Sequence, residues 1–317
     1  VYDPQNPRWE GRDRFFLDPG HMSPMLYSVL ALTGKYTLAE LAQFRQWDSP
    51  TPGHPEVNVM RGVENTSGPL GQGHTYAVGA AIAAKFLKAR FGEVMSQTIY
   101  AYISDGGIQE EISQGAGRIA GTLGLDNLIM FYDSNDIQLS TETKDVTTED
   151  VAMKYKAWDW KVIEINGNDP DAIRAALKEA KAESERPTLI IGKTTMGKGA
   201  RKADGSSYEA NCATHGAPLG GDAYINTIKN LGGNPDEPFT IFPEVAELYG
   251  RVLLRQSSES ELGCHRTESR YRHPCRFGNC ARRSCYSGGK HGSGFCRPLQ
   301  LRQNRRLPQE DTRIQTR

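Results

Sequence analysis

Cysteine is almost absent from residues 1–250 of this 317-residue chain: Cys212 is the only one there, and the other five lie in residues 251–317. A single thiol over so long a stretch is typical of a reducing compartment and excludes a disulfide-stabilised secreted domain. Long apolar runs are also missing, since no segment reaches the ~18–20 residues of a membrane span and the N-terminal VYDPQNPRWEGRDR is not a signal peptide. We therefore expect a cytoplasmic protein that has no membrane partner.

Lysine is nearly missing from the last part of the chain, and this absence marks a change of composition. Residues 251–317 contain 14 arginines and one lysine, and 15 basic against 5 acidic residues in all. Residues 1–250 contain 23 basic against 33 acidic residues, so the formal net charge of zero conceals two oppositely charged parts. We predict a globular domain over 1–250 and a separate basic, Cys/Arg-rich tail over 251–317. The first residue is valine rather than methionine, which suggests a fragment.

Residues 98–193 alternate between apolar runs typical of buried strands and segments with helical periodicity. The predicted strands are TIYAYISD (98–105), NLIMFYDSN (127–135), WKVIEING (160–167) and PTLIIGKT (187–194). The predicted helices span 20–34, 68–92, 110–124 (with apolar Ile112, Ile119 and Leu123), 148–158 and 169–184. Apolar strands separated by helices indicate an α/β fold, a doubly wound parallel sheet with helices on both faces. Ligands of such sheets bind beyond the C-terminal ends of the strands.

Asp105 stands where the first of these strands ends, and Asn135 ends the second. If the strands are neighbours, the two side chains face each other and, with a nearby carbonyl, give Mg²⁺ part of the octahedral shell that phosphate oxygens complete. Gly106 and Gly107 then let a diphosphate approach the backbone and the N-terminus of the next helix. The bland alternative is an ordinary strand-to-helix turn with an aspartate as its cap.

Six motifs in a fixed order weigh against the bland alternative. They are DPGH (18–21), TPGHPE (51–56), GPLGQG (68–73), DGGIQEE (105–111), FYDSNDI (131–137) and THGAPLG (214–220). Over roughly residues 3–250 the chain resembles transketolase, a transferase that uses thiamine diphosphate and Mg²⁺ to move two-carbon ketol units between sugar phosphates. The resemblance implies the thiamine-diphosphate-binding fold, a cytoplasmic homodimer and a place in the pentose phosphate pathway of carbohydrate metabolism.

The resemblance also implies roles for individual residues. The metal ligands would be Asp105, Asn135 and the carbonyl of Ile137, holding Mg²⁺ or another divalent cation such as Ca²⁺ or Mn²⁺. Besides Asp105 and Asn135, the cofactor would contact His21, Gly68, Pro69, Leu70, Gly106 and His215. The catalytic residues would be His21, His54 and His215, which line the channel to the thiazolium, and Glu110, which matches the acid that links the two cofactor sites of a dimer.

Histidines suit this chemistry because a substrate hydroxyl loses its proton as the ketose carbon–carbon bond breaks. Groups with a pKa near 7 pass such protons, and the cofactor serves as the electron sink. His74, inside GQGHTY, matches no histidine of the family and is expected to be structural. Trp158 and Trp160 are expected to pack in the core, and Cys212 to be an incidental thiol in a long loop over 197–221.

Parts of the family pattern are missing from this chain. It lacks the first helix with its S-G-H-P-G histidine, the pyrimidine-binding domain with the glutamate that activates the cofactor, and the C-terminal domain. We therefore expect weak or no activity from the chain alone. The alternatives are the N-terminal subunit of a split transketolase, a related thiamine-diphosphate enzyme such as dihydroxyacetone synthase, and a non-catalytic cofactor-binding or interaction domain with the tail as a basic arm.

The tail over 251–317 contains cysteines and histidines but no CxxC, and its C-x4-C-x4-C spacing matches no familiar zinc module. Reading its codons one base later permits text that resembles the start of transketolase's pyrimidine-binding domain, including an S-A-D-L element. We therefore expect the tail to be a disordered, out-of-frame translation. The arginines of an out-of-frame tail are no evidence for nucleic-acid binding. In a genuine tail, this positive charge would favour that function.

Overall fold

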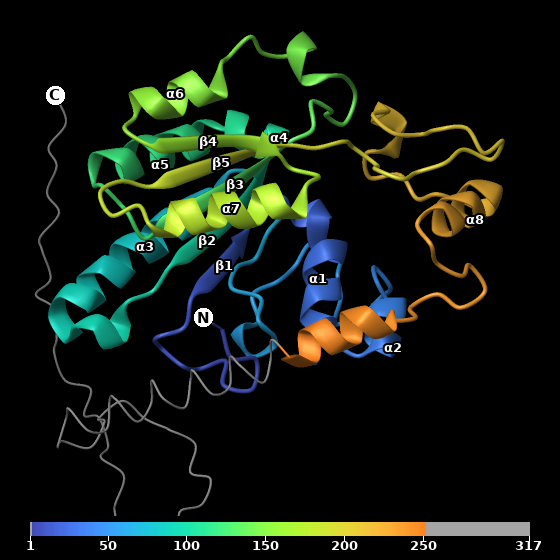
Figure 1. Ribbon diagram of the computed structural model, residues 1–317, viewed down its shortest axis with the longest axis horizontal. Coiled ribbons are helices and arrows are strands. Elements are labelled where there is room, and N and C mark those ends of the chain that lie inside the picture. Colours follow the sequence, from blue (N-terminus) through green and yellow to red (C-terminus); the bar gives the residue numbers. More distant parts are fainter. Residues whose placement is uncertain (1, 252–317) are drawn as a thin grey trace, which may run out of the picture. The chain divides into compact units, whose positions relative to one another are not determined.

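A computed structural model describes residues 2–251 of the chain; residue 1 and residues 252–317 lie outside the described part, and with them the expectations for the tail. Five parallel strands form one sheet in the order β1-β2-β3-β5-β4 (Figure 1). Their bounds are β1 Arg14–Leu17, β2 Ile99–Ser104, β3 Leu128–Ser134, β4 Lys161–Asn166 and β5 Thr188–Lys193. The predicted parallel sheet is confirmed, and each of the four predicted strands begins one residue later and ends one residue earlier than expected.

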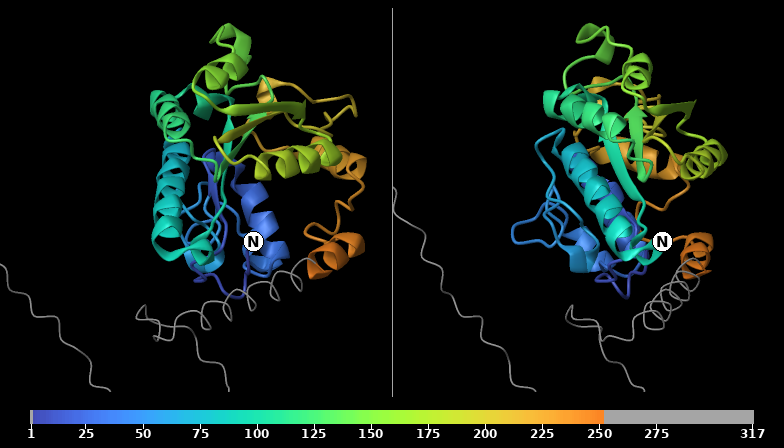
Figure 2. Two further views of the ribbon diagram at one scale, coloured as in Figure 1. Left: turned by 60° about the vertical axis from the view of Figure 1, so that its left-hand side comes forward. Right: turned by 90° about the vertical axis from the view of Figure 1, so that its left-hand side faces the viewer.

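Helices connect these strands and cover both faces of the sheet (Figures 1 and 2). Their bounds are α1 Ser23–Leu32, α2 Leu38–Ala42, α3 Gln72–Phe91, α4 Asp105–Gln109, α5 Glu111–Thr122, α6 Val151–Ala157, α7 Pro170–Lys181 and α8 Gly221–Asn230. The short 3₁₀ helices are η1 Gly20–Met22, η2 Val59–Arg61, η3 Glu93–Met95, η4 Thr143–Asp145 and η5 Cys212–Thr214, and residues 243–251 are also helical. Within the described part no helix is both long and apolar enough to cross a membrane.

The two faces of the sheet bury alternate residues of the same strands, as the pleat of a strand requires. Leu128 and Met130 of β3 pack in one cluster with the alanines of α3 and α5 and with Tyr155 of α6. Ile129 and Ile190 point to the other face, where Ala176 and Ala180 of α7 cover them. Because both faces are covered, the inner strands β2, β3 and β5 are apolar along most of their length, which is why the sequence pattern revealed them.

Helices α3 and α5 pack closely because small residues line the side that each buries. In α5 the buried side is Ser113, Ala116, Gly117, Ala120 and Gly121. On another side α5 also approaches the segment after α6, since a Cβ built on Gly121 would lie 1.7 Å from the carbonyl oxygen of Trp158. The helix predicted over 110–124 is confirmed as α5, and small residues form its buried face.

The apolar residues singled out for that helix are exposed. Ile112, Ile119 and Leu123 have exposed fractions of 47%, 51% and 52%. The small residues of this helix are the ones that pack, Ser113 against His74 of α3 and Gly117 and Gly121 against the segment from Tyr155 to Trp160. By contrast, Trp160 lies in the core as expected, where its indole N–H donates to the carbonyl of Gly117 (2.8 Å) and Trp158 packs partly buried against the same cluster.

Candidate functional site at the carboxyl edge of the sheet

Asp105 lies at the point where β2 ends and α4 begins, and its side chain is almost fully buried. One carboxylate oxygen accepts a hydrogen bond from the Tyr132 hydroxyl (2.5 Å), and the other accepts from the backbone N–H of Asn135 (3.1 Å). Strands β2 and β3 are neighbours whose register pairs Ser104 with Asp133. The structure therefore brings Asp105 and Asn135 together at one edge of the sheet, as the strand pattern predicted.

The turn that follows β3 is fixed by its own hydrogen bonds. The side-chain oxygen of Asn135 accepts from the backbone N–H of Ile137 (3.0 Å), and Asp136 between them has a left-handed φ of 63°. Lys193 of β5 holds Asp136 from the neighbouring strand through a 2.9 Å ion pair. Residues 135–137 thus form a rigid turn beside the carboxylate of Asp105.

The electrostatics of this edge favour a bound cation. Burial raises the pKa of Asp105, and the carboxylates of Asp136 and Asp133 raise it further, against the hydrogen bonds from Tyr132 and Asn135. A positive ion would offset that cost. Carboxylate, amide and carbonyl oxygens are the donors that a hard divalent ion prefers, so the residues present fit Mg²⁺.

The predicted donor set contains a single carboxylate. Among residues 2–251 there is no group of three or more His, Cys, Asp or Glu side chains that could hold a metal ion. One carboxylate and two neutral oxygens bind a free cation weakly, so an ion at this edge needs further oxygens from an anionic ligand.

The GPL turn at residues 68–70 lies against the DGG turn at residues 105–107. A Cβ built on Gly106 would lie 3.0 Å from a methyl carbon of Leu70. The segment before this turn is anchored to β1, because Asn65 exchanges hydrogen bonds with both backbone groups of Leu17 (3.1 and 3.0 Å). Two turns that are distant in the sequence therefore meet at the same edge. Pro69 is exposed there, while Gly68 and Leu70 are partly covered.

Three histidines converge near this edge from separate segments. His21 lies in η1 and His215 follows η5, and their ring centroids are 5.1 Å apart. His54 contacts the residue before His21: a Cβ built on Gly20 would lie 2.5 Å from its ring. Burial lowers the pKa of His21 to about 4, helped by the neighbouring His215 and His54. His21 is thus a neutral imidazole at pH 7.

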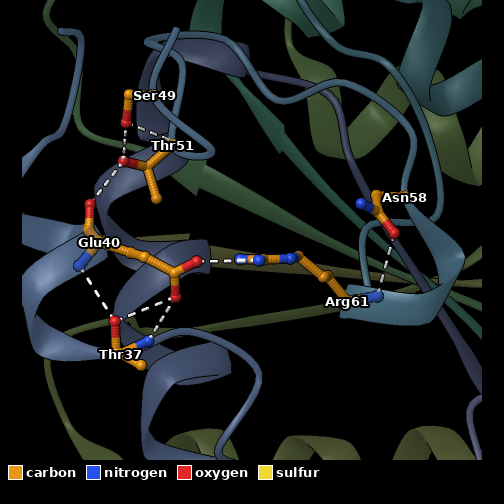
Figure 3. Close-up of polar contacts among 6 residues, drawn as sticks. All are labelled: Thr37, Glu40, Ser49, Thr51, Asn58 and Arg61. Carbon is orange, nitrogen blue, oxygen red and sulfur yellow. Dashed lines mark hydrogen bonds and ion pairs between the residues drawn. The ribbon is translucent and has the colours of Figure 1, made fainter.

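The loop that carries His54 is held by a polar cluster (Figure 3). Glu40 accepts from the backbone N–H of Thr37 (2.8 Å) in a capping box and from the guanidinium of Arg61 (2.8 Å). Its carbonyl accepts from the hydroxyl of Thr51 (3.0 Å), which also pairs with the hydroxyl of Ser49 (3.0 Å). Helix α2 therefore holds both sides of the TPGHPE loop.

Helix α1 also holds this loop, through the two residues that directly precede His54. The hydroxyl of Tyr27 donates to the carbonyl of Pro52 (3.1 Å), and the buried hydroxyl of Ser23 donates to the carbonyl of Gly53 (2.7 Å). On the other side of His54, the N–H of Ser67 donates to the carbonyl of Pro55 (2.9 Å). His54 is thus fixed by backbone hydrogen bonds before and after it. The sequence did not single out Ser23 or Tyr27, because their partners lie far away along the chain.

Glu110 and His74 have different surroundings. Glu110 lies exposed at the junction of α4 and α5, where its Cβ would be 2.8 Å from a Cβ built on Gly71. His74 is fully buried, pairs with the hydroxyl of Ser113 (2.6 Å) and packs near the rings of Tyr155 and Trp160. Burial lowers the pKa of His74 to about 3, so it is a neutral core residue, as expected.

A covered parallel sheet with an acid, an amide turn and a glycine-rich turn gathered at its carboxyl edge is typical of an α/β domain whose ligand lies beyond the ends of the strands. Sequence comparison agrees: the family model "Transketolase, thiamine diphosphate binding domain" matches residues 1–283. The chain is 44% identical over 267 residues to the plasmid-encoded transketolase of Cupriavidus necator and 42% identical over 266 residues to transketolase 1 of Vibrio cholerae. Each alignment covers 82% of this chain and 39% of the relative.

Solved structures give the same result. The transketolase of Campylobacter jejuni matches with a TM-score of 0.79 at 38% identity, over 84% of this chain and 42% of that one. The transketolase of Leishmania mexicana matches with a TM-score of 0.79 at 36% identity, over 83% of this chain and 40% of that one. The chain therefore belongs to the transketolase family, and the part described here has the fold of its thiamine diphosphate-binding domain. It spans about two fifths of the length of these relatives.

Proposed function

We propose that this chain supplies the thiamine diphosphate and Mg²⁺ site of a transketolase, the transferase that moves two-carbon ketol units between sugar phosphates. The observation that carries the proposal is the contact between Asp105 and the 135–137 turn at the ends of adjacent strands. The relatives of the chain are transketolases, and this kinship supports the reaction, its sugar-phosphate substrates and the pentose phosphate pathway. These relatives are more than twice as long as the chain.

In this proposal the residues at the carboxyl edge bind the cofactor. Asp105, Asn135 and the carbonyl of Ile137 hold Mg²⁺, or Ca²⁺ or Mn²⁺ in its place. Gly106 faces the diphosphate, and Gly68, Pro69 and Leu70 form the wall opposite it. Thiamine diphosphate, when bound, supplies an electron sink for cleavage of a carbon–carbon bond. What supports this assignment is the all-oxygen donor set and the contact between Leu70 and Gly106.

The histidines handle protons and contact substrate or cofactor. Because its pKa is lowered to about 4, His21 is free to accept a proton or a hydrogen bond at neutral pH. His215 and His54 lie beside it and shape the same approach to the cofactor. Glu110 serves a second cofactor site in a partner subunit, so the proposal includes a cytoplasmic homodimer. Exposure of Glu110 in the single chain is compatible with that role.

The test uses the 317-residue chain and a version in which the proposed reading frame of residues 251–317 is restored. Titration calorimetry with thiamine diphosphate should show saturable binding that requires Mg²⁺. An assay of xylulose 5-phosphate and ribose 5-phosphate conversion should show little turnover by the chain and clear turnover by the frame-restored version. Absence of cofactor binding in both versions would overturn the proposal, whereas binding without turnover in both would favour a non-catalytic cofactor-binding domain.

A further inference from the structure

Asp18 is a buried acid at the carboxyl end of the outer strand β1, and the site described above gives it no role. It follows the last residue of β1 and has an exposed fraction of 1%. Its backbone N–H continues the sheet by donating to the carbonyl of Tyr102 in β2 (3.0 Å). The side chain therefore starts from a rigid point between the first two strands.

One oxygen of Asp18 caps the helix that follows the GPLGQG motif. Its Oδ1 accepts from the backbone N–H of Gly73 in the first turn of α3 (2.9 Å). The N–H groups of Gly71 and His74 also favour the carboxylate, lowering a pKa that burial raises. An anion at this position is stabilised by the positive end of the helix. Asp18 thus fixes the start of α3 at Gln72, directly after the GPL turn and Gly71.

The other oxygen of Asp18 lies against the DGG turn. A Cβ built on Gly107 would be 2.2 Å from Asp18 Oδ2, closer than any real contact allows. A Cβ built on Gly73 would be 2.4 Å from the Cα of Asp18, so α3 also closes tightly on this residue. Because Gly73 and Gly107 have no side chains, Asp18 has room between the GPL turn and the DGG turn.

This arrangement has a cost in stability. Oδ2 of Asp18 is buried and has no hydrogen-bond partner among residues 2–251, and the same holds for Nε2 of His74 and the hydroxyl of Tyr155. Unsatisfied polar atoms are rare in protein interiors because each one loses its hydration without replacement. A carboxylate kept at such a place indicates a use that an apolar side chain could not serve.

We propose that Asp18 is a positioning residue that holds the GPL turn and the DGG turn at a fixed separation for the cofactor. It acts through Gly71 and Gly73 on one side and through Gly107 on the other, and it does not itself touch the cofactor or the metal. The proposal rests on the proposed function for its consequence, tighter cofactor binding. Its structural part, the clamp between two turns, stands independently of that function.

The first experiment compares Asp18→Ala and Asp18→Asn in the full chain by amide hydrogen exchange without cofactor. Asp18→Ala should speed exchange at Gly71, Gly73, Gly106 and Gly107 at least tenfold, while Asp18→Asn, which keeps an acceptor for Gly73, should stay within about threefold of the native chain. Titration with Mg²⁺ and thiamine diphosphate should show at least a tenfold weaker Kd for the alanine variant and rescue by asparagine.

The matched control is Asp169→Ala, which removes another aspartate cap, the one that accepts from Asp171 N–H (2.9 Å) at the start of α7. It should speed exchange at α7 only and leave the Kd unchanged. Unaltered exchange at the two turns in Asp18→Ala would overturn the clamp. If the native chain fails to bind thiamine diphosphate, the proposed function fails, and the exchange comparison still decides the role of Asp18.

A double-mutant cycle provides a second readout that a global loss of folding would not mimic. Gly107→Ala should lower the unfolding midpoint in the native background and lower it less together with Asp18→Ala, because the 2.2 Å clash with Oδ2 is then removed while the 2.9 Å contact with Cγ1 of Ile103 remains in both. Gly106→Ala, whose Cβ meets only Leu70 at 3.0 Å, should show additive effects with Asp18→Ala. Additivity of the Gly107 pair would contradict the contact on which the proposal stands.

Discussion

Asp105 illustrates how one residue is placed for binding at the expense of stability. Its carboxylate is buried beside two other carboxylates, and its pKa is raised because burial disfavours the charge. In the absence of a cation the folded protein therefore pays to keep this side chain ionised at pH 7. The neutral and nearly isosteric asparagine avoids that cost but offers a metal ion one weaker ligand.

We expect Asp105→Asn to weaken binding of Mg²⁺ and thiamine diphosphate by at least 100-fold. The same variant should raise the free energy of unfolding by about 0.5–2 kcal/mol, the size common for a stabilising single substitution, because no buried charge remains. Titration calorimetry and urea unfolding at pH 7 measure the two effects. Native affinity in the variant would show that the cation binds elsewhere.

His74 makes stability depend on pH. Its pKa is lowered from 6.5 to about 3 in the folded chain, so unfolding at lower pH lets the imidazole take up a proton. Stability contributed by a neutral buried histidine is complete above pH 6.5 and falls as the pH drops towards 3, by about 1.4 kcal/mol per pH unit.

We expect this slope to be missing from His74→Gln. Between pH 6.5 and pH 4.5 the unfolding free energy of the native chain should fall relative to that of the variant by about 1.4 kcal/mol per unit. Urea titrations at several pH values give the difference, in which the raised pKa values of the buried aspartates cancel. Parallel curves for the two proteins would mean that His74 titrates normally.

At the scale of elements, the close contact of α5 with the segment after α6 depends on a missing side chain. Gly121→Ala would bring a methyl group to 1.7 Å from the carbonyl oxygen of Trp158. We expect a loss of about 1–3 kcal/mol in the free energy of unfolding, typical of an overpacked interior. Gly115→Ala in the same helix is the control.

A Cβ on Gly115 meets no atom within 4 Å, so that substitution should be neutral or stabilising by about 0.5–1 kcal/mol through helix propensity. Thermal or urea unfolding of both variants separates packing from propensity. Equal effects of the two substitutions would contradict the tight contact at Gly121.

The elements that were predicted correctly share a local signature. Strands β2, β3, β4 and β5 are apolar runs bounded by polar or turn residues, and α7 is amphipathic with its Asp169 cap, so neighbours along the chain identify them. Strand β1 was missed because Arg14–Leu17 is only four residues long and its pairing with β2 is determined by distant contacts.

The candidate site also contains residues that local patterns predict and residues that depend on distant contacts. Asp105 and Asn135 were found because each directly follows an apolar run, and parallel neighbours end at one edge. The closeness of Asp18 to Gly107, and the grip of Ser23 and Tyr27 on the loop of His54, depend on contacts between segments that are distant in sequence. Local patterns carry no record of such contacts, so only the folded chain displays them.

At the scale of the whole molecule, α3 and α5 leave large apolar side chains in water. Phe86 and Tyr76 of α3 and Ile119 and Leu123 of α5 are exposed, Phe86 by 60%. Exposed apolar side chains on two packed helices are candidates for burial against a partner, where they form one patch. This supports the homodimer proposed above.

We expect the native chain to sediment as a dimer and a chain carrying Phe86→Lys and Ile119→Lys to remain folded but to sediment as a monomer. The loss should appear as at least a tenfold rise in the dimer dissociation constant. Trp47→Lys is the control, because Trp47 is 99% exposed and lies outside both helices. A double variant that dimerises like the native chain would exclude this surface.

The distance along the chain between β1 and its partner has a consequence for biosynthesis. Arg14 pairs with Ile99, and the capping of α3 by Asp18 also spans dozens of residues. At roughly 5–20 residues per second, a ribosome needs about 4–17 s to reach the strand that β1 requires. Until then the nascent segment presents unpaired backbone and apolar side chains, the kind of surface that chaperones bind.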